Sequence, residues 1–257
     1  MATALEGILF DLEGVLYQGG TPVPGAAETL DWARDRGLKT RFLTNTTLRP
    51  RAAVWRRLRD MGLPVDAEDV VTPAMAAVSL LRARGLRRVH LAAEPTLAED
   101  FAGFDLVDAR PDAVVMGDLD AGFDRARLSG LTGMLLDGAA LIALHKNRLS
   151  RPDGDLIIDL GPYVAALEYA AGVDAVVMGK PSGDFFARVL ADMSIPAAAA
   201  VMIGDDVESD IAGAQTAGLR AVQVMTGKYD PRTAGRAAPD ALIASVADLP
   251  DAIAAWT

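Results

Sequence analysis

The sequence predicts an α/β protein with a doubly wound parallel-sheet core and an inserted, smaller α/β cap domain. Short apolar runs alternate along the chain with amphipathic stretches, and runs such as 7–10 and 201–203 are apolar at almost every position. Strands of this kind are buried on both faces, which is typical of parallel sheets covered by helices. The length of 257 residues suits one large domain or two modest ones.

Glycine and proline residues mark the ends of the predicted elements. A helix over 24–36 stops at Gly37, and a helix over 73–84 begins with Pro73 in its first turn. The predicted strands are 7–10, 38–43, 89–92, 113–116, 141–144, 175–178, 201–203, 221–224 and 241–243. The predicted helices are 24–36, 51–61, 73–84, 127–136, 163–171, 185–193, 209–217 and 246–256. Residues 153–155, Asp-Gly-Asp, read as a hairpin turn.

The alternation of strands and helices runs through three consecutive parts of the chain. We expect residues 1–76 and 177–257 to form the core domain in two segments, and residues 77–176 to form the inserted cap domain. An insertion returns the chain near its exit point, so that the core sheet is not broken. A cap that closes over a site excludes water and adds substrate contacts.

Charge argues against a nucleic-acid partner. Thirty-five acidic residues against 25 basic ones give a net charge of −10, and an acidic chain repels phosphate backbones. One basic cluster is followed closely by Asp60 and Asp66 and is expected to be a solvated helix face. It consists of Arg49, Arg51, Arg56, Arg57 and Arg59.

Residue types that are scarce exclude further classes. The absence of cysteine excludes disulfides, thiolate metal sites and cysteine nucleophiles, and two histidines, His90 and His145, exclude a multi-histidine zinc site. The first residues contain no basic and apolar leader, and no apolar run approaches the length of a membrane span. We therefore expect a cytoplasmic protein with no membrane partner.

Polar residues that can carry chemistry stand at the ends of four predicted strands. Acidic residues follow the first strand at Asp11 and Glu13, and Thr44 with Asn45 follows the second. Lys180 follows the strand over 175–178. The strand over 201–203 is followed by Asp205, Asp206 and Asp210. In open parallel sheets ligands bind at the carboxyl ends of the strands, so we expect these side chains to meet in one crevice.

The chemistry of this set predicts a divalent cation beside a phosphate. Clustered carboxylates repel one another at a cost of several kcal/mol unless a cation lies between them, and oxygen ligands suit Mg²⁺. A lysine, a hydroxyl group and backbone N–H groups are suitable partners for a phosphate.

The four motifs occur in a specific order. Asp-Leu-Glu-Gly-Val begins at Asp11, Leu-Thr-Asn ends at Asn45, Gly-Lys-Pro surrounds Lys180, and Gly-Asp-Asp-x-x-x-Asp ends at Asp210. This order resembles the haloacid dehalogenase (HAD) superfamily, and within it the capped subfamily IIA phosphatases. The stretches 161–170, 202–206 and 213–215 are similar to the branch that holds phospholysine phosphohistidine inorganic pyrophosphate phosphatase. The resemblance covers nearly the whole chain.

The resemblance implies a role for each motif. Asp11 would be the nucleophile that forms an aspartyl-phosphate, and Thr44 with the Asn45 backbone would bind the phosphoryl oxygens. Lys180 would neutralise charge, and Asp205 would bind Mg²⁺ together with Asp11.

The remaining site residues would act around the metal and the leaving group. The resemblance implies that Asp206 and Asp210 support the metal site. It also implies that the residue at position 13 protonates the leaving group, activates water, and binds the metal through its backbone carbonyl. Here Glu13 stands where these phosphatases usually carry Asp, although related branches have Ser there.

The sequence thus predicts an enzyme, a Mg²⁺-dependent phosphatase acting on a small phosphorylated metabolite. A phosphoamide, pyrophosphate or a phosphomonoester are all open as substrates. Because Glu13 is one methylene longer than Asp, a catalytically weakened protein with a phosphate-binding or regulatory role is the alternative. His145, after a cap strand, either contacts substrate or lies in a solvated turn, and a homodimer remains open.

Overall fold

The computed structural model describes residues 3–119, 122–150, 157–233 and 235–256. The chain forms two compact units. The first consists of Met1–Thr44, Ala52–Val71 and Lys180–Thr257, and the second of Asn45–Arg51 and Thr72–Gly179. A boundary after residue 76 would cut helix α3 (Pro73–Ala83), whereas the second unit contains this helix whole.

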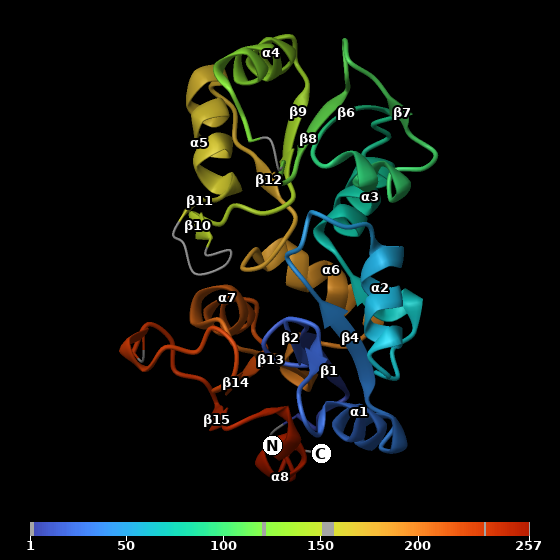
Figure 1. The fold of residues 1–257 in the computed structure, drawn as a ribbon, viewed down its shortest axis with the longest axis vertical. Helices are drawn as coiled ribbons and strands as arrows, with labels where there is room; N and C mark the ends of the chain where they lie inside the picture. Colours follow the sequence, from blue (N-terminus) through green and yellow to red (C-terminus); the bar gives the residue numbers. More distant parts are fainter. Residues whose placement is uncertain (1–2, 120–121, 151–156, 234, 257) are drawn as a thin grey trace. The chain divides into compact units, whose positions relative to one another are not determined.

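The first unit is built on a six-stranded sheet in the order β15-β14-β13-β1-β4-β5, in which every neighbouring pair is parallel (Figure 1). Its strands are β1 (Gly7–Asp11), β4 (Lys39–Leu43), β5 (Val70–Val71), β13 (Ala200–Gly204), β14 (Arg220–Val224) and β15 (Ala241–Ile243). A separate antiparallel hairpin, β2 (Tyr17–Gln18) and β3 (Thr21–Pro22), follows β1.

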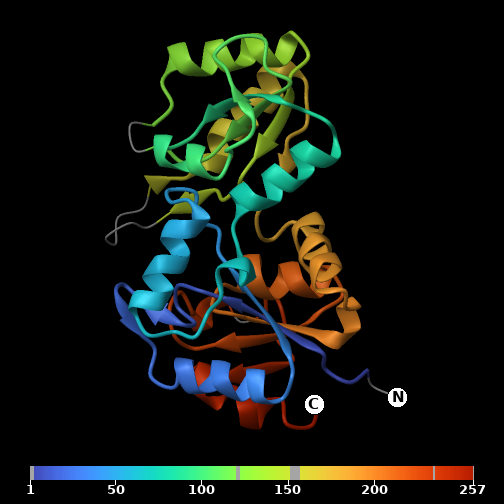
Figure 2. The same ribbon diagram turned by 90° about the vertical axis from the view of Figure 1, so that its right-hand side faces the viewer.

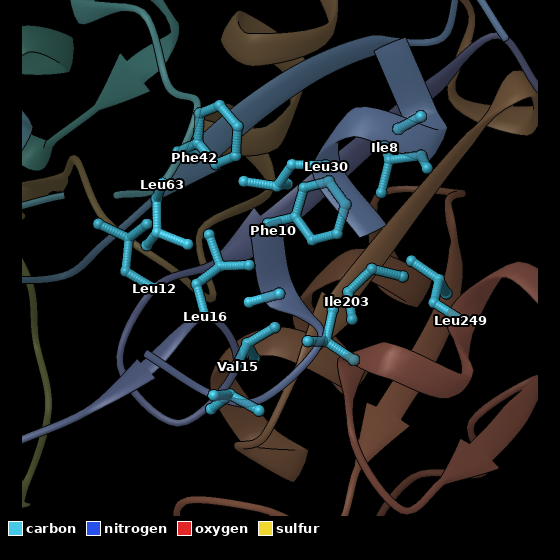
Figure 3. Packing of buried hydrophobic residues seen from close by; sticks show 14 of the residues in the cluster. Ile8, Phe10, Leu12, Val15, Leu16, Leu30, Phe42, Leu63, Ile203 and Leu249 are labelled. Carbon is cyan, nitrogen blue, oxygen red and sulfur yellow. The ribbon is translucent and has the colours of Figure 1, made fainter. Parts of the chain in front are cut away.

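The centre of this sheet is apolar on both faces, as the continuous apolar strands predict. All five residues of β1 and all five of β13 are buried. Phe10 is paired in register with Phe42 on β4 and with Ile203 on β13, and the two phenylalanine rings stack 5.9 Å apart (Figure 3). Burying one such side chain fully contributes about 1.5–3 kcal/mol, so the strands that carry the site are firmly anchored.

Helices cover the two faces of the core sheet. On one face, side chains of α1, α2 and α8 join the apolar cluster that contains Phe10. Figure 2 shows α1 and α8 on one side of the sheet and α6 on the other. The helices of this unit are α1 (Ala26–Asp35), α2 (Arg51–Asp60), α6 (Gly183–Met193), α7 (Gly213–Thr216) and α8 (Leu249–Ala252).

Two predicted helices of the core differ in detail from the structure. Instead of one helix over 209–217, a π-helical turn, Val207–Ala212, precedes the short α7. A π-helical turn is wider than an α-helical one, and such turns are frequent at functional sites. Instead of one helix over 246–256, a 3₁₀ turn, Val246–Asp248, precedes α8, whose first turn holds Pro250. Proline lacks the N–H that a continuous helix needs there.

The second unit has its own parallel sheet, in the order β12-β9-β8-β6-β7. Its strands are β6 (Arg88–Ala92), β7 (Asp105–Leu106), β8 (Ala113–Met116), β9 (Ala140–Ala143) and β12 (Val176–Val177). Helices α4 (Arg125–Leu136) and α5 (Leu160–Ala171) pack on one face in an apolar cluster with Val114 and Leu141. An antiparallel pair, β10 (Leu149–Ser150) and β11 (Ile157–Ile158), lies outside this sheet.

Side chains that accept hydrogen bonds from the first turn mark the starts of helices α3 and α5 in the second unit. Thr72 caps α3 by accepting from the Met75 N–H, and Pro73 occupies the first turn as predicted. Helix α5 begins at Leu160, three residues earlier than predicted, because the Asp159 side chain accepts from the Leu160 N–H. The predicted turn at 153–155 lies outside the described residues. Within the ranges that the structure describes, no helix is both long and apolar enough for a membrane span.

Candidate active site

Three neighbouring strands of the first unit bring the predicted site residues to one edge of the sheet. Asp11 is the last residue of β1, Thr44 directly follows β4, and Asp205 directly follows β13. The register places Asp11 opposite Leu43 on one side, and it places Phe10 opposite Ile203 on the other. Neighbouring parallel strands that end level with one another therefore place these side chains together.

Lys180 joins this group where the chain re-enters the first unit. Its Nζ lies 2.5 Å from Asp11 Oδ1 and 2.6 Å from Asp210 Oδ1, and only 3% of its side chain is exposed. A buried ammonium group is stabilised by such hydrogen-bonded carboxylate partners, since removing it from water is costly. Lys180 therefore links the nucleophile candidate of β1 to the acidic turn after β13.

Two glycines make room for the Asp205 carboxylate. A Cβ on Gly14 would lie 2.1 Å from Asp205 Oδ2, and a Cβ on Gly227 would lie 2.0 Å from the same atom. Both glycines have positive φ angles, which other residues rarely adopt. The backbone N–H of Lys228 donates to Asp205 Oδ2 at 2.7 Å, so the loop after β14 fixes this carboxylate.

Asp206 and Asp210 have different tasks, although they stand in one motif. The Asp206 side chain accepts from the N–H groups of Glu208 and Ser209 and so caps the π-helical turn. Asp210 is fully buried, and its Oδ2 accepts from the Asp206 N–H at 3.1 Å. Gly204 permits this approach, because a Cβ there would lie 2.2 Å from the Cβ of Asp210.

The electrostatics of the site show an excess of negative charge. Burial, reinforced by the charges of Asp11 and Asp210, raises the pKa of Asp205 to about 8. Burial also raises the pKa of Asp210 to about 6, although Lys180 opposes that shift. Burial alone would lower the pKa of Lys180, but the carboxylates of Asp11 and Asp210 raise it above its usual value. Lys180 is thus charged, while the carboxylates compete for protons.

This group of carboxylates fits a divalent cation. Oxygen atoms of Asp11, Asp205 and Asp210 all lie within 4.8 Å of one another. Together the three can carry more negative charge than the single ammonium of Lys180 balances, and hard oxygen donors suit Mg²⁺ or Ca²⁺. Buried carboxylates that lie close together favour protonation when no cation lies between them. The raised pKa values of Asp205 and Asp210 therefore agree with a cation-binding site.

Glu13 lies apart from the three clustered carboxylates. Its side chain is exposed, and its Oε1 accepts from the Gly19 N–H at 2.8 Å. The structure therefore does not bring the Glu13 carboxylate into the acidic group, and this carboxylate is hydrogen-bonded to the β2–β3 hairpin instead.

Thr44 and Asn45 are adjacent in the chain but belong to different compact units. Thr44 is buried, and its N–H donates to the Val71 carbonyl at 3.2 Å. Asn45 packs against Gly179 within the second unit, where a Cβ on Gly179 would lie 2.7 Å from Asn45 Oδ1.

Sequence reasoning missed the loop that follows β14. Thr226 donates its hydroxyl to the Gly14 carbonyl at 2.5 Å, and Lys228 places its Nζ 3.9 Å from Asp206 Oδ2. The charges of Asp206 and Asp205, working against burial, raise the pKa of Lys228. The signal was available, because this loop also follows the carboxyl end of a core strand.

Two arginines of the cluster that was expected to be a solvated helix face also stack on aromatic rings. Arg57 is half-buried, its guanidinium lies 4.8 Å from the centre of the Tyr17 ring, and it donates to the Gly19 carbonyl. Arg59 lies 4.9 Å from the Trp55 ring centre on the same helix. Stacking on aromatic rings is a common use of arginine.

His145 does not lie in a solvated turn. Its ring is 2% exposed, and its Nε2 lies 3.1 Å from Asp118 Oδ2 and 3.9 Å from Asp159 Oδ1, all within the second unit. The Asn147 N–H donates to its Nδ1 at 3.3 Å, so Nε2 carries the proton that Asp118 accepts. The ring is a satisfied buried histidine. His90 is satisfied in the same way, with Nδ1 2.9 Å from the Val107 carbonyl.

Comparison with known proteins places these motifs in a family. The family model described as "Haloacid dehalogenase-like hydrolase" matches residues 8–107, and a second model of HAD-hydrolase-like proteins matches residues 177–249. The phospholysine phosphohistidine inorganic pyrophosphate phosphatase of Bos taurus is 39% identical over 233 residues, which cover 88% of this chain and 85% of the relative.

Solved structures agree with the sequence matches. A p-nitrophenyl phosphatase from Archaeoglobus fulgidus superposes with a TM-score of 0.89 at 25% identity, covering 97% of this chain and 99% of its own. A glycerol phosphate phosphatase from Mycobacterium tuberculosis, in complex with magnesium, superposes with a TM-score of 0.81 at 30% identity, covering 96% of this chain and 76% of its own. The chain therefore belongs to the haloacid dehalogenase-like hydrolases and is a phosphatase of that family.

Proposed function

We propose that this phosphatase is Mg²⁺-dependent and removes phosphate from a small phosphorylated metabolite through an aspartyl-phosphate on Asp11. The observation that carries the proposal is the buried Lys180 ammonium held between Asp11 and Asp210, beside Asp205. The residues proposed as nucleophile, counter-charge and metal donors thus lie together at one edge of the core sheet. The inserted second unit is proposed to act as the cap domain.

In the first half-reaction Asp11 attacks the phosphorus atom. Lys180 occupies Oδ1 of Asp11, so the other oxygen, Oδ2, is available as the nucleophile. As the new bond between phosphorus and Oδ2 forms, the bond to the leaving oxygen or nitrogen breaks. Glu13 gives its proton to the leaving group. The Thr44 hydroxyl and the Asn45 backbone are proposed to hold the phosphoryl oxygens.

In the second half-reaction water hydrolyses the acyl phosphate. The Glu13 carboxylate takes a proton from the water as its oxygen bonds to phosphorus, and the bond to Asp11 breaks to release inorganic phosphate. Lys180 remains protonated and stabilises the returning charge on Asp11. The cycle regenerates Asp11 as a carboxylate and Glu13 as an acid.

The proposed metal donors are the side chains of Asp11 and Asp205 and the backbone carbonyl of Glu13, with Asp210 in support. A bound Mg²⁺ supplies positive charge next to the phosphoryl group and offsets the repulsion between that group and the carboxylates. Asp206 is proposed to support the site indirectly, because it caps the turn that carries Asp210.

Phosphoamides, pyrophosphate and phosphomonoesters are the substrate classes that we propose. The bovine relative is named for phospholysine, phosphohistidine and pyrophosphate, and the mycobacterial structure for glycerol phosphate. All of these carry a terminal phosphoryl group on a nitrogen or oxygen atom, which the attack of Asp11 requires.

The test is hydrolysis of p-nitrophenyl phosphate with and without Mg²⁺. We expect the wild type to turn over with Mg²⁺ only and Asp11→Asn to lose activity at least about 1,000-fold. Asp31→Asn is the matched control, because Asp31 lies exposed on α1, where its side chain accepts a hydrogen bond from Arg34; it should keep full activity.

The alternative function is binding of a phosphate ligand without efficient turnover. It is favoured by one observation: the exposed Glu13 side chain is not among the carboxylates that lie within 4.8 Å of one another. An inert wild type, with activity appearing only in Glu13→Asp, would support that alternative and contradict the proposal.

A further inference from the structure

The Glu13 side chain is held by the β2–β3 hairpin rather than left free. The Gly19 N–H, at the tip of the hairpin, donates to Glu13 Oε1 at 2.8 Å. The Tyr17 side chain faces the same carboxylate, since the negative charge of Glu13 and a hydrogen bond to it are among the causes that raise the pKa of Tyr17. Backbone contacts bring the two residues together, since Glu13 and Tyr17 form an isolated β-bridge. A carboxylate with two donors has a defined position.

Tyr17 is suited to be a permanent donor. Only 7% of the residue is exposed. Burial and the negative charge of Glu13 raise the pKa of Tyr17 to about 12, while Arg57 opposes and Asp11 adds to that shift. The hydroxyl therefore keeps its proton at any pH at which the enzyme would work.

Arg57 supports both donors from the outside. Its guanidinium lies over the Tyr17 ring, 4.8 Å from the ring centre, and it also donates to the carbonyl of Gly19. That carbonyl and the N–H that Glu13 uses belong to the same residue. Arg57 thereby ties helix α2 to the hairpin at the two points from which Glu13 is held.

We propose that Tyr17 and Arg57 are positioning residues that hold the Glu13 carboxylate in place for proton transfer, a proposal that rests on the proposed function. The extra methylene of glutamate extends the side chain by roughly 1.5 Å compared with aspartate, which lets it reach the hairpin donors. A misplacement of about 1 Å can cost about 100-fold in rate. The hairpin offsets the longer side chain by fixing where it ends.

The experiment uses two aryl phosphates that differ in leaving group. The leaving group of phenyl phosphate is a basic phenolate that needs a proton. The leaving group of p-nitrophenyl phosphate, p-nitrophenolate, departs readily without one. We measure kcat/KM with Mg²⁺ for wild type, Tyr17→Phe and Arg57→Met, each also in a Glu13→Gln background. Arg59→Met is the matched control, since it removes a similar stacked arginine from the same helix.

We expect Tyr17→Phe and Arg57→Met to lower kcat/KM about tenfold for phenyl phosphate and less than about threefold for p-nitrophenyl phosphate. In the Glu13→Gln background neither change should lower the rate further, because the group that they position is gone. Arg57→Lys should recover part of the loss by donating to Gly19, and Arg59→Met should leave both rates unchanged.

Equal losses on both substrates that persist in the Glu13→Gln background would overturn the inference, since they would indicate a structural role only. A faster Tyr17→Phe enzyme would overturn it too, because the hairpin would then hold Glu13 away from its task. Either result leaves the proposed function standing if Asp11→Asn is inactive; an active Asp11→Asn would contradict the proposed function itself.

Discussion

Asp205 shows how single atoms decide the geometry of the site. Its Oδ2 lies where a Cβ of Gly14 or of Gly227 would have to be, so both positions require glycine for space as well as for conformation. Such a close approach is common where backbone and ligand-binding groups meet. The loop from Thr226 to Lys228 is thus part of the proposed metal site.

A pair of glycine-to-alanine substitutions separates the steric effect of an added Cβ from the effect of the left-handed backbone conformation. Gly227 and Gly37 have nearly equal φ angles, 65° and 68°, but only Gly227 would place a Cβ against Asp205. We expect each alanine variant to lose about 1–2 kcal/mol of unfolding free energy from the left-handed conformation. Only Gly227→Ala should also weaken Mg²⁺ affinity and kcat/KM, by at least about tenfold. Denaturant unfolding and a Mg²⁺ titration of activity provide the two readouts.

The sequence could predict part of the acidic centre at residue level because Asp11 and Asp205 stand at the ends of core strands, and the structure brings them together with Lys180 and Asp210. Lys180 was also expected to follow a core strand, but the strand before it, β12, belongs to the sheet of the second unit. The partnership of Tyr17 with Arg57 could not be predicted, since it joins residues 40 positions apart in two elements whose packing the local pattern does not specify.

At the level of elements, the turn between β13 and α7 orients the proposed metal donors. The Asp206 side chain caps a π-helical turn, and Asp210 returns its carboxylate to the Asp206 N–H and to Lys180. Capping by Asp replaces lost backbone hydrogen bonds and contributes about 1 kcal/mol. The turn is therefore stabilised by its own side chains as well as being part of the site.

Removal of a helix-capping side chain should affect activity only where the capped turn carries a residue of the site. Asp206→Ala and Ser245→Ala each remove the side chain that accepts from the first turn of a helix in the first unit. Both are expected to cost about 1 kcal/mol of stability. Asp206→Ala should in addition lower kcat at least about tenfold, because Asp210 loses its fixed position. Equal kcat values in the two variants would show that the position of Asp210 does not depend on the capping side chain of Asp206.

Continuous apolar runs predicted the core strands well, because full burial leaves little ambiguity about what they are. The two-residue strands β5 and β7 were missed, since so short an element has no pattern of its own. The π-helical turn was expected to be an ordinary helix because one extra residue in a turn barely changes the apolar spacing.

At the scale of the whole molecule, the site links stability to pH and to metal. Asp205 and Asp210 have folded-state pKa values raised to about 8 and about 6, above the usual value of 3.8. A raised pKa means that the folded state binds protons more tightly than the unfolded chain. That contribution to stability is fully present below about pH 4 and is lost as the pH rises towards 8.

Thermal unfolding should follow this linkage. In EDTA we expect the contribution of these two carboxylates to lower the Tm between about pH 5 and pH 8. Mg²⁺ at about 100 times its Kd should raise the Tm by about 5–10 °C at pH 8, and by much less at pH 5, where protons compete for the same oxygen atoms. Asp205→Asn should abolish most of the Mg²⁺-dependent shift. A Mg²⁺ effect that is equal at both pH values would contradict the assignment of these donors.

The central claim is that Asp11 becomes covalently phosphorylated during turnover. The most direct measurement is an acid quench of the enzyme during steady-state hydrolysis of p-nitrophenyl phosphate with Mg²⁺, followed by mass spectrometry of its peptides. We predict a phosphoryl group on the peptide that contains Asp11, sensitive to hydroxylamine as an acyl phosphate is, and absent from Asp11→Asn. The account would be contradicted if the wild type turned over without any adduct and the Asp11→Asn enzyme kept its activity.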